Sequence, residues 1–444
     1  MSSLCSCRSG WRAETRAARA GGARSRPVPA SLTGPILAGH DVLVLDDPAS
    51  FFTDHAIQDP YPLYRRLREA GPVHRIGDAG FHLVCSWAAV DEAIKRPQVF
   101  SSNLTATMTY RDGQVVPFEL DGLGGPSHAL ATADDPAHAL HRRLLVPHLA
   151  ARRLPALERL ITDTFDRLWE QGCTDGHIEW MGALANRLPM IVVARLIGVP
   201  EDDVDALIRW AGASTHMLDG LIDDDGLAAS GAAAMQLGGY IAEHFTTALA
   251  EPRDNLLGAL ATACAAGEVD PQTAQLMMII LFSAGGESTG SLLGNALWTM
   301  ATRPDVWQAL RDNPALIPDF IEEVLRFEPP FRGHYRHVLA DTELGGVDLA
   351  AGSRLLLLWG AANRDPAQFA RPDEFRLQRP GGKSHLAFGR GAHFCIGAAL
   401  ARLEARMVLR RVLGRVRTLE ATEVGPWLPS ILIRRREYLH LTVG

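Results

Sequence analysis

Apolar residues recur at the spacing of an α-helix over much of this chain, most clearly in Leu157–Trp169 and Leu188–Ile197. A longer helical pattern begins at Asp270-Pro271, where the aspartate predicts a cap and the proline suits the first turn, and continues to about Ala301. A helix of about thirty residues spans about 45 Å, which is enough to cross a domain. Strand-like segments are short and fewer. The pattern predicts a mainly α fold with a small β-rich region.

Three segments qualify this reading. Residues 101–130 are rich in Ser, Thr, Gly and Pro without a clear period, which predicts a long loop. Residues 428–443 predict a terminal pair of strands. The long helix is apolar enough for a membrane span, but glycines and the charged Glu287 stand in its middle, so we expect a buried core helix instead.

Composition narrows the class of protein. Of the 444 residues, 47% are hydrophobic, and the net charge of −7 argues against general nucleic-acid binding. Six scattered cysteines predict neither a disulfide scaffold nor a zinc site. Residues 1–40 are Arg-rich and poor in acids, and we expect a disordered extension there, followed by one domain over residues 41–444.

The segment with the strongest chemical signal surrounds Cys395. Three glycines let the backbone pass close to a bulky group, and a helix-forming sequence follows at once. A cysteine at the start of a helix meets the positive end of the helix dipole, which favours the thiolate. Taken alone, Cys395 also suits a buried structural cysteine, or a nucleophile with His393 as its base. The segment reads Phe388-Gly389-Arg390-Gly391-Ala392-His393-Phe394-Cys395-Ile396-Gly397.

The middle of the long helix carries an unusual run. Two adjacent glycines cost about 1 kcal/mol each relative to alanine, which indicates close approach of another group or a local distortion. An acid and two alcohols follow within an apolar helix, and a buried carboxylate is expensive unless it has a use. A helix kink with hydroxyls bonded back to the chain is the simpler alternative. The run is Ala284-Gly285-Gly286-Glu287-Ser288-Thr289.

Two further pairs have helical spacing. Glu323 and Arg326 lie three apart on one helix face, which in isolation indicates a surface salt bridge. His138 and Arg142 lie four apart and in isolation indicate a solvated face.

The pattern Phe-Gly-x-Gly-x-His-x-Cys-x-Gly resembles the haem-binding loop of cytochromes P450. The resemblance implies their triangular, mainly α haem-thiolate fold with a long central helix over the haem, and Cys395 as the iron ligand. Glu287, Ser288 and Thr289 then resemble the family's catalytic acid-alcohol motif, with serine at the position more often occupied by threonine. Glu323 and Arg326 together resemble the family's structural Glu-x-x-Arg motif. The third member of that group is either Arg376 or Arg379, and the sequence leaves the choice open.

The same resemblance implies haem b as cofactor, bound without covalent attachment because no Cys-x-x-Cys-His occurs. The implied contacts comprise propionate partners, loop residues and two residues of the long helix, and they are His138, Arg142, Arg336, His393, Phe388, Gly389, Cys395, Gly397, Ala284 and Gly285. The implied substrate pocket includes Met108, Phe331, Leu428 and Ile431.

The implied activity is insertion of one oxygen atom of O2 into an apolar organic substrate. Only about fifty residues follow Cys395, so we expect electrons from a separate ferredoxin and an NAD(P)H-dependent ferredoxin reductase. The donor is expected to meet a basic face containing Lys383, Arg390, Arg402 and Arg406. We further expect a cytoplasmic monomer without a membrane span. Residues 101–108, 330–337 and 361–366 look like a soluble actinobacterial subgroup, similar to the mycobacterial cytochromes P450 grouped as family 144.

Three alternatives remain open at this point. A haem-binding ligand sensor or sequestering protein predicts haem spectra without turnover. A haem-free cysteine enzyme predicts a colourless protein. A specialised oxidative coupling by a cytochrome P450 stays within the same fold, and Ser288 in place of threonine is compatible with it.

Overall fold

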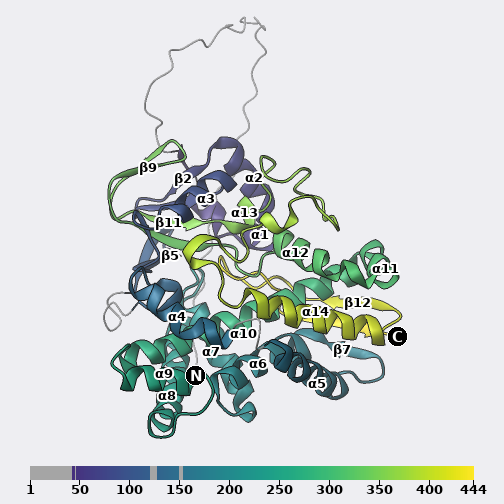
Figure 1. Ribbon diagram of the computed structural model, residues 1–444. Helices are drawn as coiled ribbons and strands as arrows, with labels where there is room; N and C mark the ends of the chain where they lie inside the picture. Colours follow the sequence, from purple (N-terminus) through teal and green to yellow (C-terminus); the bar gives the residue numbers. More distant parts are fainter. Residues whose placement is uncertain (1–42, 46, 121–127, 150–153) are drawn as a thin grey trace, which may run out of the picture. The chain divides into compact units, whose positions relative to one another are not determined.

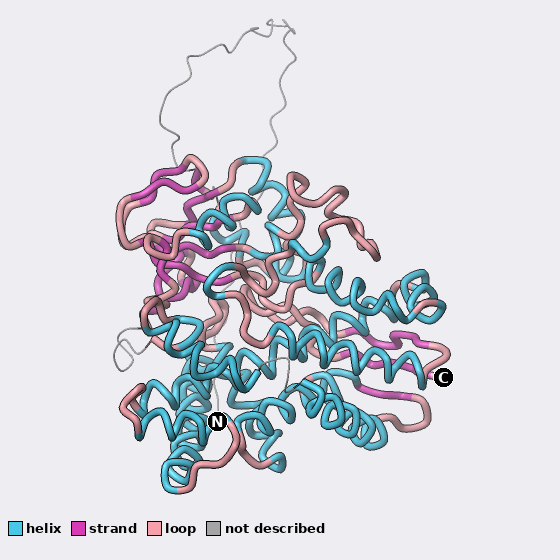
Figure 2. Tube along the Cα trace, viewed as in Figure 1, coloured by secondary structure: helices cyan, strands magenta, loops and turns pink. Residues whose placement is uncertain are grey.

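The computed structural model describes residues 43–45, 47–120, 128–149 and 154–444 (Figure 1). The extension predicted for residues 1–40 lies outside the described residues. Helices predominate, and the strands gather mainly in one region, at the upper left of Figure 2. The predicted mainly α class with a small β-rich region is therefore confirmed.

The main sheet has six strands in the order β1-β2-β3-β11-β8-β4. The pairs β1–β2 and β3–β11 are parallel, and the other neighbours are antiparallel. The strands are β1 (Leu43–Val44), β2 (Val73–Ile76), β3 (Phe81–Val84), β4 (Phe100–Ser101), β8 (His334–Val338) and β11 (Arg354–Leu357). The short helices α2 (Tyr61–Ala70), α3 (Trp87–Lys95) and α13 (Trp359–Ala362) lie near this sheet in Figure 1.

Longer helices form the other part of the domain (Figure 1). They are α4 (Ala137–Leu149), α5 (Leu154–Gly172), α6 (Arg187–Ile197), α7 (Val204–His216), α8 (Asp224–Ala250), α9 (Leu256–Ala265), α10 (Pro271–Thr302), α11 (Pro304–Asp312), α12 (Ile317–Phe327) and α14 (Ala398–Arg415). The short helix α1 (Asp54–Gln58) precedes α2. Most of their apolar side chains share one large core cluster, which explains the helical period of the sequence.

Helix α10 is the predicted long helix, and it runs through the core. The side chain of Asp270 accepts a hydrogen bond from the Thr273 amide at 2.8 Å, which caps the helix as expected. Its glycines allow close packing: a Cβ on Gly286 would lie 2.5 Å from Met190 Cε of α6. Among the described residues, α10 alone is long and apolar enough to cross a membrane, and 50% of its apolar window is buried in the protein core.

Residues 101–130 contain a β-hairpin where we expected a loop. Strands β5 (Ala106–Arg111) and β6 (Gln114–Glu119) pair antiparallel around Asp112 and Gly113, whose φ angles are +50° and +80°. Two positive φ angles match the short turn that Asp-Gly favours, so this dipeptide was the signal that the composition obscured. The prediction of a long loop over this segment was wrong for residues 106–119.

The C-terminal region also differs from the predicted pair of strands over 428–443. One strand, β13 (Leu439–Val443), pairs with β12 (Leu419–Val424) and β7 (His177–Glu179) in a three-stranded sheet. Strands β9 (Thr342–Leu344) and β10 (Val347–Leu349) form a separate hairpin.

Residues between β12 and β13 are attached to α10 and α12 instead of forming a strand. The guanidinium of Arg434 is 2.9 Å from the carboxylate of Glu328 and also donates to the Ile57 carbonyl. Asn295 of α10 donates to the carbonyls of Glu328 and Arg434. The buried polar partners of this segment explain why it leaves the sheet.

Candidate functional site

Cys395 lies in a tight loop directly before α14. Its amide donates to the Phe388 carbonyl at 2.8 Å, and Gly389 and Gly391 have φ angles of +63° and +66°, which favour glycine. Burial raises the pKa of the Cys395 thiol, while the amide of Gly397 and the charges of Arg142 and Arg402 act in the opposite direction. The helix terminus alone therefore does not produce the thiolate that we expected from its dipole.

His393 does not pair with this cysteine as a base. Its Nε2 lies 3.0 Å from Ser102 Oγ, and its ring stacks on His138 with centroids 3.9 Å apart. Burial and the nearby Arg336 lower the pKa of His393 to about 3. A buried thiol with a raised pKa and no adjacent base is a poor nucleophile, which argues against the haem-free cysteine enzyme.

One cavity brings together the separate motifs of the sequence. Its walls come from α4, α6, α10, β8 and the cysteine loop. The predicted residues that line it are His138, Arg142, Ala284, Gly285, Ser288, Thr289, Phe331, Arg336, Phe388, Gly389, His393, Cys395 and Gly397.

Arg336 makes this cavity suited to an anionic group. Its guanidinium donates to the Tyr335 carbonyl at 2.7 Å and forms no ion pair with a carboxylate of the described residues. Burial lowers the pKa of Arg336 to about 10, with Asp134 opposing that shift from a distance. A half-buried cation held away from bulk water without a counter-ion is expensive, so this part of the cavity favours an anionic group. Two carboxylates on a planar group would meet this need, with Arg142 and His138 on the same cavity.

The acid and the alcohols of α10 face different surroundings. Ser288 and Thr289 line the cavity, and Ser288 Oγ donates to the Ala284 carbonyl at 2.5 Å. Glu287 does not line it. Its carboxylate lies 3.9 Å from the guanidinium of Arg435, and burial raises the pKa of Glu287 while Arg435 opposes the shift.

We did not predict the partner of Glu287 from the sequence. Arg435 follows Arg434 in a basic run near the C-terminus, far from α10 in the chain. The Thr215 hydroxyl of α7 donates to the Ala211 carbonyl and lies near enough to oppose the rise in the pKa of Glu287. The one available signal was that this run of arginines lies among apolar residues, which indicates buried charge partners.

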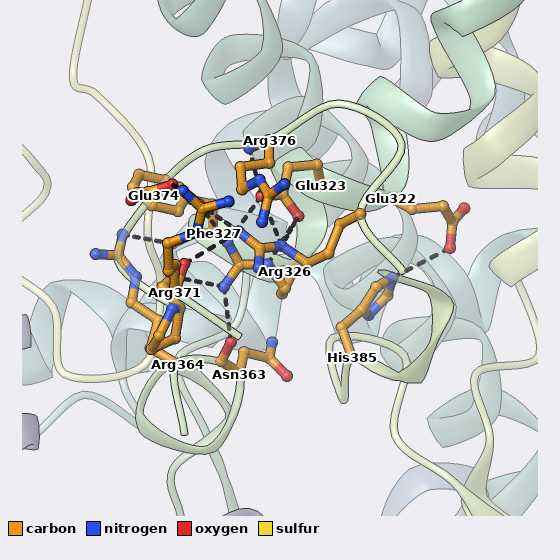
Figure 3. A network of polar contacts seen from close by, with 12 residues as sticks. Glu322, Glu323, Arg326, Phe327, Asn363, Arg364, Arg371, Glu374, Arg376 and His385 are labelled. Carbon is orange, nitrogen blue, oxygen red and sulfur yellow. Dashed lines mark hydrogen bonds and ion pairs between the residues drawn. The ribbon is translucent and has the colours of Figure 1, made fainter. Parts of the chain in front are cut away.

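The Glu323 carboxylate is fully surrounded by donors (Figure 3). Arg326 donates to it from Nε at 2.7 Å and from Nη2 at 2.8 Å, and Arg379 Nε lies 3.1 Å from both oxygens. Arg376 contributes its backbone amide at 2.8 Å, not its side chain. The structure thus settles the open choice: Arg379 supplies the third charged group.

A second charged group lies beside it. Glu322 accepts from Arg402 of α14 at 2.6 and 2.8 Å and is 3.2 Å from His385 Nε2. Burial opposes ionisation, but the hydrogen bonds from Arg402 and His385 outweigh it and lower the pKa of Glu322 to about 2. This contact joins α12, α14 and the segment before the cysteine loop (Figure 3 shows Glu322 and His385).

The basic face expected for an electron donor is largely paired within the chain. Arg402 is engaged with Glu322, Arg390 with Asp91 at 2.9 Å, and Arg406 with Glu158 at 3.5 Å. These contacts reduce the net positive charge that this face offers to a partner.

Glu404 of α14 was not predicted. It lines the cavity, is 1% exposed, and its Oε2 has no hydrogen-bond partner among the described residues. Burial raises the pKa of Glu404 to about 8. A helical run of Ala, Leu and Arg around it gave no sign that this acid is buried.

The predicted pocket residues separate into two groups. Phe331 lines the cavity. Met108 and Ile431 are fully buried in a different core cluster with residues of α1 and α2, and Leu428 donates its amide to the Arg435 carbonyl. These three do not line the cavity: Met108 and Ile431 are buried elsewhere, and Leu428 is half-buried in the segment before β13.

The fold agrees with comparisons to known proteins. A model of the family "Cytochrome P450" matches residues 241–439. The chain is 32% identical over 391 residues to the cytochrome P450 monooxygenase PikC of Streptomyces venezuelae, covering 85% of this chain and 89% of PikC. The chain belongs to the cytochrome P450 family, and it is a monooxygenase of that family.

Among its relatives, the chain is similar to Cytochrome P450 144 of Mycobacterium tuberculosis, with 62% identity over 401 residues, 90% of this chain and 92% of that protein. The solved structure of cytochrome P450 CREJ with (4-ethylphenyl) dihydrogen phosphate has a TM-score of 0.80 at 27% identity, covering 87% and 98% of the two chains. The solved structure of CYP150A6 of Mycobacterium marinum, in the substrate-free form, has a TM-score of 0.75 at 30% identity. The match covers 89% of this chain and 98% of that chain.

Proposed function

We propose that this protein binds haem b in the cavity described above, with the Cys395 thiolate as the residue that would hold its iron. The observation that carries the proposal is that Cys395 and the unpaired, half-buried Arg336 line one cavity. Arg336, Arg142, His138 and His393 are the proposed partners of the two propionates. A bound iron would place positive charge beside the half-buried Cys395 thiol and would favour its ionised form.

The residues of α10 that line the same cavity as Cys395 are proposed to hold and move protons. A bound haem with a thiolate ligand supplies the chemistry of dioxygen activation and oxygen transfer. Gly285 and Ala284 leave room for close approach, and the hydroxyl groups of Ser288 and Thr289 hold a proton or a water molecule at the cavity wall. The Glu287 carboxyl, whose pKa is raised by burial, stores the proton behind them.

We further propose an apolar organic substrate, because most of the cavity wall is aliphatic or aromatic. Electrons are proposed to come from a ferredoxin and its NAD(P)H-dependent reductase. The haem domain is proposed to comprise residues 41–444, with residues 1–40 as an extension, in a monomeric cytoplasmic protein.

The first test is the absorption spectrum of the reduced, carbon-monoxide-bound protein beside its Cys395→Ser variant. A strongly red-shifted Soret band in the wild type, absent from the variant, is the expected result, because only a thiolate ligand shifts the band in this way. A band at the position of histidine-ligated haem, or a variant identical to the wild type, contradicts the assignment of Cys395.

A further inference from the structure

His334 is a polar residue on the cavity wall that the proposed mechanism does not use. It begins β8, and Arg336 lies two residues further on the same face of the strand, while Tyr335 points to the other side. Tyr335 Oη accepts a hydrogen bond from the Met108 amide at 3.1 Å, which fixes that orientation. His334 and Arg336 both line the cavity.

Trp359 fixes which nitrogen of His334 carries the proton. The indole Nε1–H donates to His334 Nδ1 at 2.5 Å, and an indole nitrogen can only donate. The neutral imidazole therefore carries its proton on Nε2. Trp359 is itself immobilised, because it is 2% exposed in the core beneath the main sheet. The Phe331 ring, with its centroid 5.1 Å from the imidazole, lies beside His334.

The exposed surface of His334 faces the cavity and not bulk water. His334 has substantial accessible surface, yet burial by surrounding protein lowers its pKa to about 3, with Arg336 acting in the same direction. Accessible surface and desolvation coexist only where a side chain borders an internal space. Nε2 has no hydrogen-bond partner among the described residues.

We propose that the Nε2–H of His334 is a hydrogen-bond donor to an oxygen atom of the substrate. The inference rests on the proposed haem site and narrows its substrate class to apolar molecules that carry a carbonyl, ester or hydroxyl oxygen. A ligand without an acceptor leaves this buried donor unpaired, and the unpaired donor costs binding free energy. The site therefore binds a pure hydrocarbon less tightly than a similar molecule that carries an oxygen. His334 is thus a specificity-determining residue.

A haem propionate is the competing acceptor, and two observations favour the substrate. Four other groups on the cavity, Arg336, Arg142, His138 and His393, already suit two propionates. A neutral donor adds little beside the charge of Arg336, whereas the neutral oxygen of an otherwise apolar ligand has few other donors on this wall.

The test uses iron-binding probes, because the substrate is unidentified. The probes are 1-(acetylphenyl)imidazoles with the acetyl group in the ortho, meta or para position, each compared with its isopropyl analogue of similar shape. Spectral titration of the haem-loaded protein gives the dissociation constants. We expect at least one acetyl isomer to bind about threefold to tenfold more tightly than its analogue, as a single neutral hydrogen bond allows.

Variants assign that preference to His334. His334→Phe abolishes it, His334→Gln retains part of it because an amide can both accept from Trp359 and donate, and Trp359→Phe weakens it. Val193→Ala, an apolar change on the same cavity, leaves it unchanged. The parent 1-phenylimidazole must shift the Soret band in every variant, which tests the proposed haem site separately.

Haem retention, measured as haem transfer to apomyoglobin, distinguishes the two acceptors. Unchanged transfer in His334→Phe together with a lost acetyl preference supports the proposal. Faster transfer from this variant without any effect on probe preference assigns His334 to a propionate and overturns the proposal. An acetyl preference that persists in His334→Phe, or none in the wild type, also overturns it.

Discussion

At the scale of single residues, Ser288 and Glu287 lie on two faces of α10, and the proposed mechanism divides proton handling between them. The Ser288 hydroxyl donates back to the Ala284 carbonyl, so its lone pairs remain available to a donor in the cavity. Glu287 lies on the other face beside Arg435. A proton stored on the acid therefore reaches the cavity through the alcohol or a water molecule, and not directly.

Replacing Ser288 tests this division. Ser288→Ala is expected to leave haem content intact and to raise the hydrogen peroxide released per NADPH oxidised about threefold or more, because the cavity wall loses the hydroxyl group proposed to hold a proton or a water molecule there. Peroxide and NADPH are measured together with a ferredoxin and reductase present. Ser291→Ala is the matched control, because Ser291 bonds back to the Glu287 carbonyl and does not line the cavity. Equal peroxide release from both variants would remove Ser288 from the proposed mechanism.

At the scale of elements, the charged groups on α12 hold together segments that local sequence does not connect. Arg326 donates to the carbonyls of Asn363, Pro372 and Glu374 as well as to Glu323 (Figure 3). The irregular segment after α13 has few strands or helices to satisfy its backbone, and this guanidinium supplies the missing donors.

The two arginines near Glu323 give a matched pair of variants. Arg379→Leu leaves a buried carboxylate short of one charged partner and is expected to destabilise the protein by about 3–5 kcal/mol. Arg376→Leu keeps the backbone amide that Glu323 uses and is expected to change stability far less. Urea unfolding of the haem-loaded variants measures both. Similar losses in the two variants would contradict the assignment of Arg379 as the charged partner.

Some elements were predictable because their signals are local. The cap at Asp270, the packing glycines of α10 and the cysteine loop follow from a few adjacent residues. Contacts that join distant segments gave no such signal: Arg435 meets Glu287 and Trp359 fixes His334 only after the chain has folded. The β5–β6 hairpin lies between these two cases in how well it could be predicted. Its Asp-Gly turn is a local signal, but the surrounding residues are rich in Ser, Thr, Gly and Pro, which favoured a loop.

At the scale of the whole molecule, the stability of the protein depends on pH through two glutamates whose pKa values are shifted in opposite directions, Glu322 and Glu404. Glu322 has a lowered pKa, so its contribution is present at neutral pH and is lost only as the pH falls toward about 2. Glu404 has a raised pKa, so the native state holds its proton more tightly than the unfolded state, and ionisation works against the fold.

Glu404 should therefore make the protein less stable as the pH rises. The native state binds more protons than the unfolded state between the ordinary glutamate pKa of 4.5 and about 8, so the free energy of unfolding decreases as the pH rises across this range. Glu404→Gln is expected to remove this decrease, on the order of a few kcal/mol, while retaining the shape of the side chain. Unfolding free energies at several pH values check this, with the difference between variant and wild type isolating Glu404. Parallel curves for the two proteins would show that Glu404 is not the titrating group.

The ion pair between Glu287 and Arg435 also determines when, during synthesis of the chain, this part of the site can form. A ribosome makes the chain from its N-terminus, and a domain folds as a unit once its residues have emerged. Arg435 and strand β13 are translated after every other part of the site, so Glu287 has no partner until this later segment has emerged. The pairing of Glu287 with Arg435 is therefore among the last steps in the assembly of this site, long after α10 itself has been made.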